Sequence, residues 1–372
     1  MKTSIIIPVF NEASNIPALL RSLERATRKS LQTEILFIDN GSTDGSQTLL
    51  EASKTKIMRV LSETQRGFAE PLNRGVKEAR GELLLFLDAD AFPDSRWVSA
   101  MEKALSSSDI VVGQTESLLP TDPSNYGKLA AKLFHGHSER TAQARGHALP
   151  WGPTCNLGVR KALFDETGLF SSEATSAFDI DWCWRALLKG AQIAFCKEAK
   201  VEHLRRNERY ALLQQFERYG AGEAWLHKSY SFLLNPEDQS IDPLLAGVDA
   251  FRRLRHGSEA SRAKSLLPVL EEVASAFAAG VRLGYDRPHR ACRMVRAAPM
   301  KPIHWHSGKD TVTIFVPGKG LTELKGKPLA IWKAMQAGED KAILTKRFMK
   351  LFRVNEQEAL HELEHFAENL TP

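Results

Sequence analysis

The stretch Gly81–Phe92, GELLLFLDADAF, decides how the first half of the chain is interpreted. Its five consecutive apolar residues, Leu83 to Leu87, have the length and composition of a buried strand. They lead directly to two carboxylates, Asp88 and Asp90. Two acids at the end of a buried strand raise each other's pKa unless a positive charge lies nearby. The pattern therefore leaves two alternatives, a site for a divalent cation or an ordinary solvated strand end.

Strand-like runs alternate with helix-like segments before this point. The strand-like runs are rich in apolar and β-branched residues and cover residues 3–10, 33–40 and 56–63. The segments between them place apolar residues at helical spacing and cover residues 11–27, 41–53 and 67–81. This alternation predicts an α/β fold with an open, mostly parallel sheet and helices on both faces.

Polar residues follow three of these strands where each one ends. They are Asn11 and Glu12, Asp39 and Asn40, and Asp88 and Asp90. The carboxyl ends of parallel strands meet at one edge of the sheet, and ligands bind there. A hard cation such as Mg²⁺ or Mn²⁺ takes oxygen ligands, often from carboxylates and substrate phosphates together. Three polar clusters at one edge favour the cation site over the solvated strand end.

In order and spacing, these segments resemble the family-2 glycosyltransferases of the GT-A fold, which is Rossmann-like. The resemblance covers roughly residues 1–225 and lies in the segments SIIIPVFNEASNI, ILFIDNGSTDGS, QRGFAEPLNRGVKEARGELLLFLDADAF and FDIDWCWRALLKG. Two positions depart from the family pattern. Asn40 stands where a second acid is usual, and Phe178 stands where the family usually has Glu.

The resemblance implies an inverting transferase that uses a nucleotide sugar, with a role for each matched residue. The residues it assigns to the nucleotide are Pro8, Phe10, Asn11, Glu12, Asp39, Gly67, Asn73 and Asp88. Asp39 would accept a hydrogen bond from a uracil ring, which points to a UDP-sugar. Asp90 would bind Mn²⁺ or Mg²⁺, with His203 as a further ligand. Asp179 would be the general base that takes the proton of the acceptor.

Several of these side chains also have an ordinary structural interpretation. Asp179 and Asp181 could cap the helix that follows them, and His203 could be a surface histidine. Trp151 and Asn156, in the segment WGPTCN, could line the acceptor site together with Asp181, or could belong to the core. One base for the acceptor and one means of stabilising the leaving nucleotide are enough for an inverting transfer.

The second half of the chain is predicted to contain a helical region and a further domain. The boundaries follow from these patterns: a transferase domain over residues 1–225, a helical linker region over 226–301 and a C-terminal domain over 302–372. Residues 120–150 are expected to form a loop or mobile helix over the site. The last domain combines a strand pair with three short helices, which predicts a small winged-helix-like α+β fold.

The C-terminal domain resembles the PqqD-like peptide-binding family, also called RiPP recognition elements. The matching residues are Leu324, Ile331, Trp332 and Gly338, while Lys325 replaces the usual Asn. Members of that family bind a leader peptide as an added strand beside their own sheet. A capping or dimerisation domain is the structural alternative.

Three functions are compatible with these patterns. The first is glycosylation of a Ser, Thr or Cys of a ribosomally made precursor peptide that the C-terminal domain recruits through its leader. The second is the same enzyme acting in polysaccharide or lipid-linked glycan synthesis. The third is a non-catalytic nucleotide-sugar binder, which the intact acids Asp88, Asp90 and Asp179 disfavour.

Composition narrows the partners and the compartment. The net charge of +5 gives little reason to expect nucleic acid as a partner. The four cysteines are scattered without metal-binding spacing, which is typical of a reducing compartment and predicts neither disulfides nor a zinc site. No stretch approaches the ~20 apolar residues of a membrane span. A cytoplasmic protein is expected, and its oligomeric state stays open.

Overall fold

The computed structural model describes residues 2–28, 30, 32–144, 148–174, 176–230, 266–286, 303–308, 310–316 and 320–370. The chain divides into two compact units. The first consists of Met1–Ala186 and Ile193–Cys292, and the second of Leu187–Gln192 and Arg293–Pro372.

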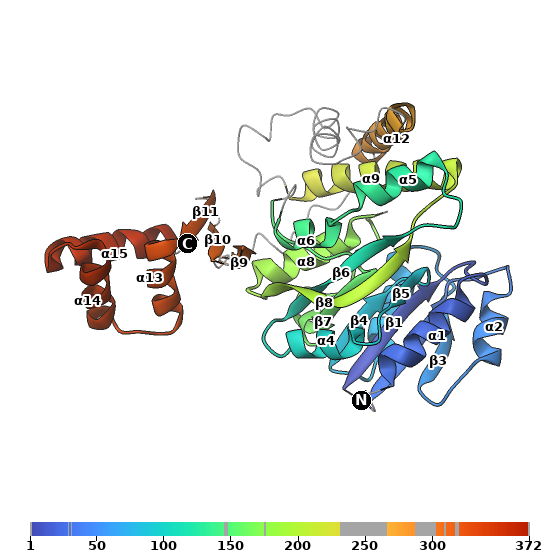
Figure 1. The fold of residues 1–372 in the computed structure, drawn as a ribbon, viewed down its shortest axis with the longest axis horizontal. Helices are drawn as coiled ribbons and strands as arrows, with labels where there is room; N and C mark the ends of the chain where they lie inside the picture. Colours follow the sequence, from blue (N-terminus) through green and yellow to red (C-terminus); the bar gives the residue numbers. More distant parts are fainter. Residues whose placement is uncertain are drawn as a thin grey trace. The chain divides into compact units, whose positions relative to one another are not determined.

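An eight-stranded sheet is the centre of the first unit (Figure 1). Its strands are β1 (Thr3–Val9), β2 (Thr33–Asp39), β3 (Met58–Ser62), β4 (Leu83–Leu87), β5 (Ala91–Pro93), β6 (Ile110–Leu118), β7 (Asn156–Arg160) and β8 (Ile193–Leu204). They lie in the order β3-β2-β1-β4-β7-β6-β8-β5. The first four neighbours are parallel, whereas β7 runs antiparallel to both β4 and β6. The predicted α/β fold with a mostly parallel sheet is confirmed.

Helices cover both faces of this sheet. They are α1 (Ile16–Thr27), α2 (Ser46–Ala52), α3 (Ala69–Glu78), α4 (Trp97–Ala104), α5 (Asn125–Leu133), α6 (His137–Ala142), α7 (Leu163–Thr167), α8 (Phe178–Leu188), α9 (Arg209–Ser229) and α12 (Leu267–Asp286). Helices α1 and α4 share a buried cluster with Ile5 and Ile7 of β1. Helix α3 approaches the other face, where a Cβ on Gly75 would lie 2.3 Å from Cγ2 of Ile6. Glycine at that position allows the helix to pack directly on the strand.

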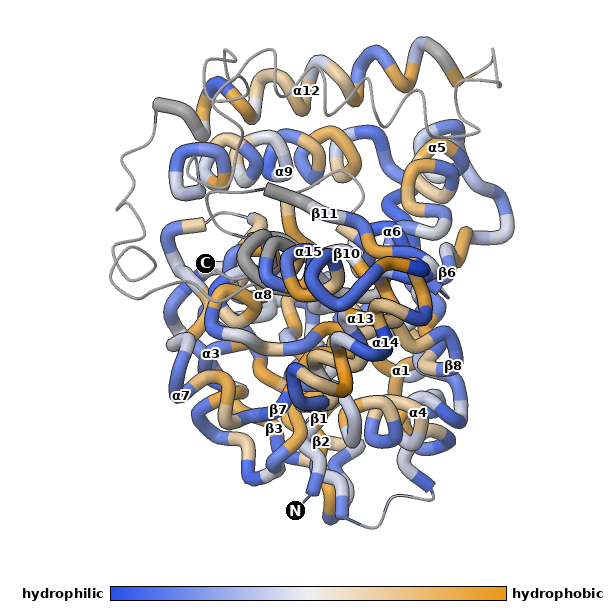
Figure 2. Tube along the Cα trace, turned by 90° about the vertical axis from the view of Figure 1, so that its left-hand side faces the viewer, coloured by the Kyte–Doolittle hydropathy of each residue, from blue (hydrophilic) through white to orange (hydrophobic). Residues whose placement is uncertain are grey.

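The segment predicted as a loop or mobile helix, residues 120–150, contains the two short helices α5 and α6. Strand β6 precedes this segment, and β7 and α7 follow it. The helical region that follows begins with α9, and α12 runs alongside it (Figure 1, Figure 2). Their shared core includes Leu212, Phe216, Val273 and Phe277. Residues 231–265 and 287–301 of the predicted helical linker region lie outside the described residues.

None of the helices in the described part of the chain combines the length and apolar character that a membrane span requires. Helix α12 illustrates this, because hydrophilic residues interrupt its apolar ones along its whole length (Figure 2).

The second unit has its own sheet and core. It contains β9 (Ile303–Gly308), β10 (Thr311–Val316), β11 (Gly320–Lys325), α13 (Gly326–Gln336), α14 (Lys341–Phe352) and α15 (Glu356–Leu370). The three strands form an antiparallel sheet in the order β11-β10-β9. The three helices agree with the number predicted, and the sheet has a third strand where a pair was expected. A winged-helix arrangement of these elements stays a prediction. The added strand, β11, contributes Leu324 to a core with Val312, Ile314 and Trp332.

Candidate active site

The carboxyl ends of β1, β2 and β4 bring the predicted polar residues to one edge of the sheet. Val9 pairs with Asp39, so the two strands end side by side. The loop after β1 is tied to the loop after β2: the Asn11 side chain accepts a hydrogen bond from Thr43 N (2.8 Å), and Asn11 N donates to Ser42 Oγ (3.0 Å). Asn11 has a positive φ of 56°, which Asn tolerates better than most residues.

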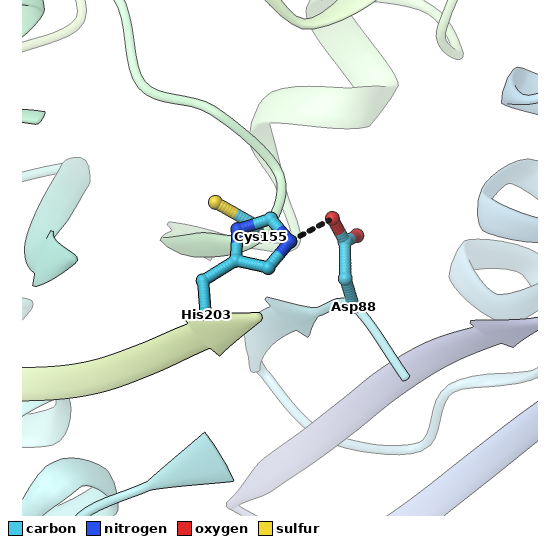
Figure 3. Close-up of side chains that lie close together, drawn as sticks. All are labelled: Asp88, Cys155 and His203. Atoms are coloured by element: carbon cyan, nitrogen blue, oxygen red, sulfur yellow. Dashed lines mark ion pairs between the residues drawn. The ribbon is translucent and has the colours of Figure 1, made fainter. Parts of the chain in front are cut away.

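Strand β8 delivers His203 to the acids that follow β4. Asp90 is followed at once by β5, which pairs antiparallel with β8 so that Ala91 lies opposite His203. His203 Nε2 is 3.1 Å from Asp90 Oδ1. It is 3.9 Å from Asp88 Oδ2, and Figure 3 draws this second pair. Arg206 Nη2 lies 3.7 Å from Asp90 Oδ2. The pairing of β5 with β8 thus brings together residues that lie more than 100 positions apart in the sequence.

The charges of this cluster largely balance one another. Burial alone would lower the pKa of His203, but the charge and the hydrogen bond of Asp90 raise the pKa of His203 to about 10. Burial would raise the pKa of Asp90, yet His203 holds it below its ordinary value. For Asp88, burial prevails over the opposing effect of His203 and raises the pKa to about 6. A protonated His203 therefore offsets much of the repulsion between the two acids.

Cys155 completes a group of metal-ligating side chains that the sequence did not predict. One ligand atom each of Asp88, Cys155 and His203 lies within 4.8 Å of the other two (Figure 3). The three residues come from the segments next to β4, β7 and β8, which meet only in the folded sheet. The one signal in the sequence was the position of Cys155 beside Asn156, a predicted site residue.

Asp39 has a carboxylate oxygen without a hydrogen-bond partner. Its Oδ2 accepts hydrogen bonds from Gly41 N (3.0 Å) and Ser42 N (3.1 Å). Its Oδ1 is buried and finds no partner among the residues that the structure describes. A buried oxygen that accepts no hydrogen bond costs free energy until a donor satisfies it. The side chain of Asn40, the next residue in the chain, instead donates to Glu63 O and Gln65 O. This residue, which departs from the family pattern, therefore fixes the backbone of the loop at residues 63–65.

Phe10 and Glu12 lie on the loop after β1. The Phe10 ring is exposed, with the Arg66 guanidinium 4.8 Å from its centroid. Burial, followed by the charge of Asp90, raises the pKa of Glu12 to about 7. Pro8 is half-buried within β1, and Gly67 N donates to Asn40 Oδ1 over 3.3 Å.

Asp179 stands in the first turn of α8 and is partly buried. Its Oδ1 accepts a hydrogen bond from Ile180 N at 3.0 Å. Burial is the largest cause that raises the pKa of Asp179 to about 6, and the negative charge of Asp88 acts in the same direction.

Four other predicted site residues have partners within the protein fold. Asn73 and Phe170 exchange two hydrogen bonds, each 2.9 Å long, between the Asn73 amide and the Phe170 backbone. Asn156 is fully buried; its Oδ1 accepts from Trp97 Nε1 (2.8 Å), and its Nδ2 donates to backbone carbonyls of β6 and β8. Trp151 is buried, with its ring against His137.

Asp181 is the fourth of these residues. Its Oδ2 accepts from Arg185 Nη2 (2.7 Å) and Nε (3.0 Å), and its Oδ1 accepts from Tyr230 Oη (2.6 Å). All of these groups are buried. Asn73, Asn156, Trp151 and Asp181 thus make contacts within the first unit, and their assignment to the nucleotide or the acceptor stays a prediction.

Comparison with known proteins identifies the class of enzyme. Residues 4–168 match the family model Glycosyl transferase family 2. The protein is a glycosyltransferase. Glycosyltransferase AglE of Haloferax volcanii is 28% identical over 225 residues, which are 59% of this chain and 72% of that protein. Succinoglycan biosynthesis protein ExoA of Rhizobium meliloti is 27% identical over 228 residues, 59% of this chain and 68% of that protein.

A solved structure shares the fold of this glycosyltransferase. The mannosyltransferase PcManGT from Pyrobaculum calidifontis, in complex with GDP-Man and Mn²⁺, superposes with a TM-score of 0.52 at 18% identity. The match covers 77% of this chain and 88% of that chain. At this identity the likeness concerns the fold, and it supports the GT-A-like architecture of the first unit.

Proposed function

We propose that this glycosyltransferase moves a sugar from a UDP-sugar to a hydroxyl group of a glycan, with inversion at the anomeric carbon and with the help of a divalent cation. The observation that carries the proposal is the meeting of Asp88, Asp90 and His203 at the sheet edge, with Asp179 near enough for its charge state to respond to Asp88. The third hypothesis from the sequence, a non-catalytic binder, does not account for a base of raised pKa beside a ligand cluster.

The donor atoms at this edge fit Mn²⁺ or Mg²⁺. Asp88 and Asp90 supply carboxylate oxygens and His203 an imidazole nitrogen, a set that suits Mn²⁺ in particular. When bound, the cation would offset the negative charge of the leaving diphosphate. The mannosyltransferase that shares the fold was crystallised with Mn²⁺, which supports this choice.

Asp39 is suited to select the nucleotide base. Its unpartnered Oδ1 needs a donor, and the imide N–H of uracil is a donor of the required kind. The exposed ring of Phe10, held under Arg66, offers an apolar face at the same edge for a base or ribose. Glu12 and Asn11 complete the loop that would surround the nucleotide.

Asp179 is suited to the role of general base. A base works best when its pKa lies near the working pH, and burial moves the Asp179 pKa towards that range. Its hydrogen bond from Ile180 N fixes the carboxylate on the first turn of α8. In this role Asp179 would remove the proton of the acceptor hydroxyl as that oxygen attacks the sugar.

The proposal of a glycan acceptor is supported by relatives of this protein. The alternative, a peptide acceptor, is supported by one feature of the second unit. The name of the ExoA relative places that protein in succinoglycan biosynthesis. A peptide acceptor remains the second candidate because β9 and β11 are the outer strands of a three-stranded sheet. Such strands are the surfaces that bind extended peptides by strand addition.

Isothermal titration of UDP, GDP and ADP in the presence and absence of Mn²⁺ tests the donor assignment. We expect Mn²⁺-dependent binding of UDP in the wild-type chain, and loss of that dependence in Asp90→Ala under conditions where melting curves show that the variant stays folded. Equal affinity for UDP in the variant and the wild type, with the same response to Mn²⁺, would exclude Asp90 as a metal ligand.

A further inference from the structure

We propose that Cys155 is a third protein ligand beside Asp88 and His203, and that the three form a site for a thiophilic divalent cation such as Zn²⁺ when no nucleotide is bound. The inference goes beyond the proposed transfer reaction and shares two residues with its metal site. It concerns which cation the protein binds in the absence of nucleotide.

Strand register holds Cys155 beside Asp88. Strands β4 and β7 are antiparallel, and Leu87 lies opposite Asn156. One step further along both strands, Asp88 leaves β4 as Cys155 enters β7. The backbone therefore places these two side chains across from each other at the edge where β4 ends.

His203 reaches the same point from a third strand. Its position is set by the pairing of Ala91 with His203 and by the hydrogen bond from Leu204 N to Asp90 O, 3.0 Å. The ligand atoms of Asp88, Cys155 and His203 then lie within 4.8 Å of one another (Figure 3). Small side-chain rotations suffice to bring a sulfur, a nitrogen and an oxygen onto one ion.

The chemistry of this set differs from that of an oxygen-only site. Zn²⁺ accepts thiolate, imidazole and carboxylate in one tetrahedral site, and three protein ligands leave a fourth position for water or substrate. Mg²⁺ favours oxygen ligands and gains little from sulfur. A site with Cys155 therefore prefers Zn²⁺ or Co²⁺ over Mg²⁺.

Binding through Cys155 has a defined proton balance. The thiol of Cys155 loses its proton as the metal–sulfur bond forms, and the imidazolium of His203 loses one as the metal–nitrogen bond forms, so each cation bound releases two protons to solvent. No oxidant or reductant takes part. The same set of atoms would let Zn²⁺ compete with Mn²⁺ for Asp88 and His203, because both cations need these two side chains.

Cobalt spectroscopy of the full chain without nucleotide tests the proposal. Co²⁺ substitutes for Zn²⁺, and a cobalt–thiolate bond has a charge-transfer absorption in the near ultraviolet. We expect this band in the wild-type chain, its loss in Cys155→Ser, and its displacement by added Zn²⁺. We also expect Cys155→Ser to weaken Zn²⁺ binding by at least the ~10–100-fold that loss of an outer-shell partner costs.

Cys196→Ser is the matched control, because Cys196 is equally buried and lies in β8 but does not belong to the group of Asp88, Cys155 and His203. Its Sγ lies 3.9 Å from Ala100 O and 3.7 Å from Glu198 Oε2. This control should keep the cobalt band. Melting curves without metal verify that both variants are folded, and Cys155→Ala serves in place of Cys155→Ser if the latter unfolds. A wild-type chain without the band, or a band that persists in the Cys155 variants, would overturn the proposal. UDP binding with Mn²⁺ is measured separately, so a failure here leaves the proposed transferase function intact.

Discussion

Asp179 and Asp181 are two residues apart in α8 but have different surroundings. Asp179 is partly buried and keeps a carboxylate with a raised pKa near Asp88. Asp181 is buried and places both oxygens on Arg185 and Tyr230. We therefore expect Asp179 to serve the proposed chemistry and Asp181 to serve stability, and each suggests its own test.

Asp179→Asn should lower the turnover number without weakening donor binding. The amide has nearly the same shape as the carboxylate but cannot accept the acceptor's proton, and general bases typically contribute ~10²–10⁴-fold to a rate. Steady-state kinetics gives the turnover, and titration with UDP in Mn²⁺ gives donor affinity. Weaker UDP binding with normal turnover at saturation would make Asp179 a donor contact instead.

The turnover of the wild-type chain should fall as the pH drops through about 6. The base acts only when it is unprotonated, and the pKa of Asp179 is raised to about 6, so acid removes the active form. A plot of the logarithm of turnover against pH should rise with a slope near one below that pH and then level off. In Asp179→Asn the residual activity should lack this step, and a step retained in the variant would assign it to another group.

Asp181→Ala should destabilise the fold. The substitution leaves the buried Arg185 guanidinium without its carboxylate, and breaking a buried ion pair from one side costs about 3–5 kcal/mol of unfolding free energy. Chemical denaturation measures the loss. Asp179→Ala is the matched control, since it lacks such a partner and should change the unfolding free energy much less. Equal losses in the two variants would contradict the division of roles.

At the scale of secondary structure, the pairing of strands decides the site. The alternation of strands and helices over residues 3–87 could be predicted from the sequence because each element has its own period of apolar residues. The pairing of β5 with β8 and of β4 with β7 joins segments far apart in the chain, and no local pattern encodes it. For that reason Asp88 and Asp90 could be predicted as ligands from their own strand end, whereas Cys155 could not.

Buried amides show the same limit. The family resemblance assigns Asn73 to the nucleotide, whereas the sequence leaves Asn156 between the acceptor site and the core. Their partners are backbone groups of distant elements, such as Phe170 for Asn73. A single sequence does not reveal a hydrogen bond to a remote backbone group, so structural and ligand-binding Asn residues look alike in it.

Asn73→Ala should therefore lower stability and leave UDP affinity unchanged. Removing the amide leaves the N–H and C=O of Phe170 without partners in a buried place, and each such group costs about 1–3 kcal/mol. The measurements are urea denaturation and UDP titration under conditions where the variant stays folded. A variant of normal stability with weakened UDP binding would restore the nucleotide contact that the sequence predicted.

At the scale of the whole molecule, the second unit has a core of its own. The residues that suggested the peptide-binding resemblance are part of that core: Ile331 is fully buried, and Leu324 and Trp332 are nearly so. Gly338 has a φ of 74° and ends α13. These positions are explained by packing and by a helix end, so they indicate a fold more directly than they indicate a ligand.

Truncation after residue 301 should leave hydrolysis of the donor sugar and transfer to a glycan acceptor unchanged. Every residue proposed for donor, metal and base lies in the first unit. The assay compares kcat/KM of intact and truncated chains on a glycan acceptor and on peptides with and without a leader segment. The melting temperature of the truncated chain verifies that it is folded.

The peptide candidate makes a different prediction for the same pair of chains. A leader bound to an outer strand of the second sheet would hold the acceptor at an effective concentration in the mM range near the active site. Truncation would then raise KM for the leader-bearing peptide, leave kcat alone because the lost contacts are remote from the reacting atoms, and have no effect on the leaderless peptide. If the leader instead has no influence on either chain, the second unit plays no part in acceptor choice and the glycan acceptor stands.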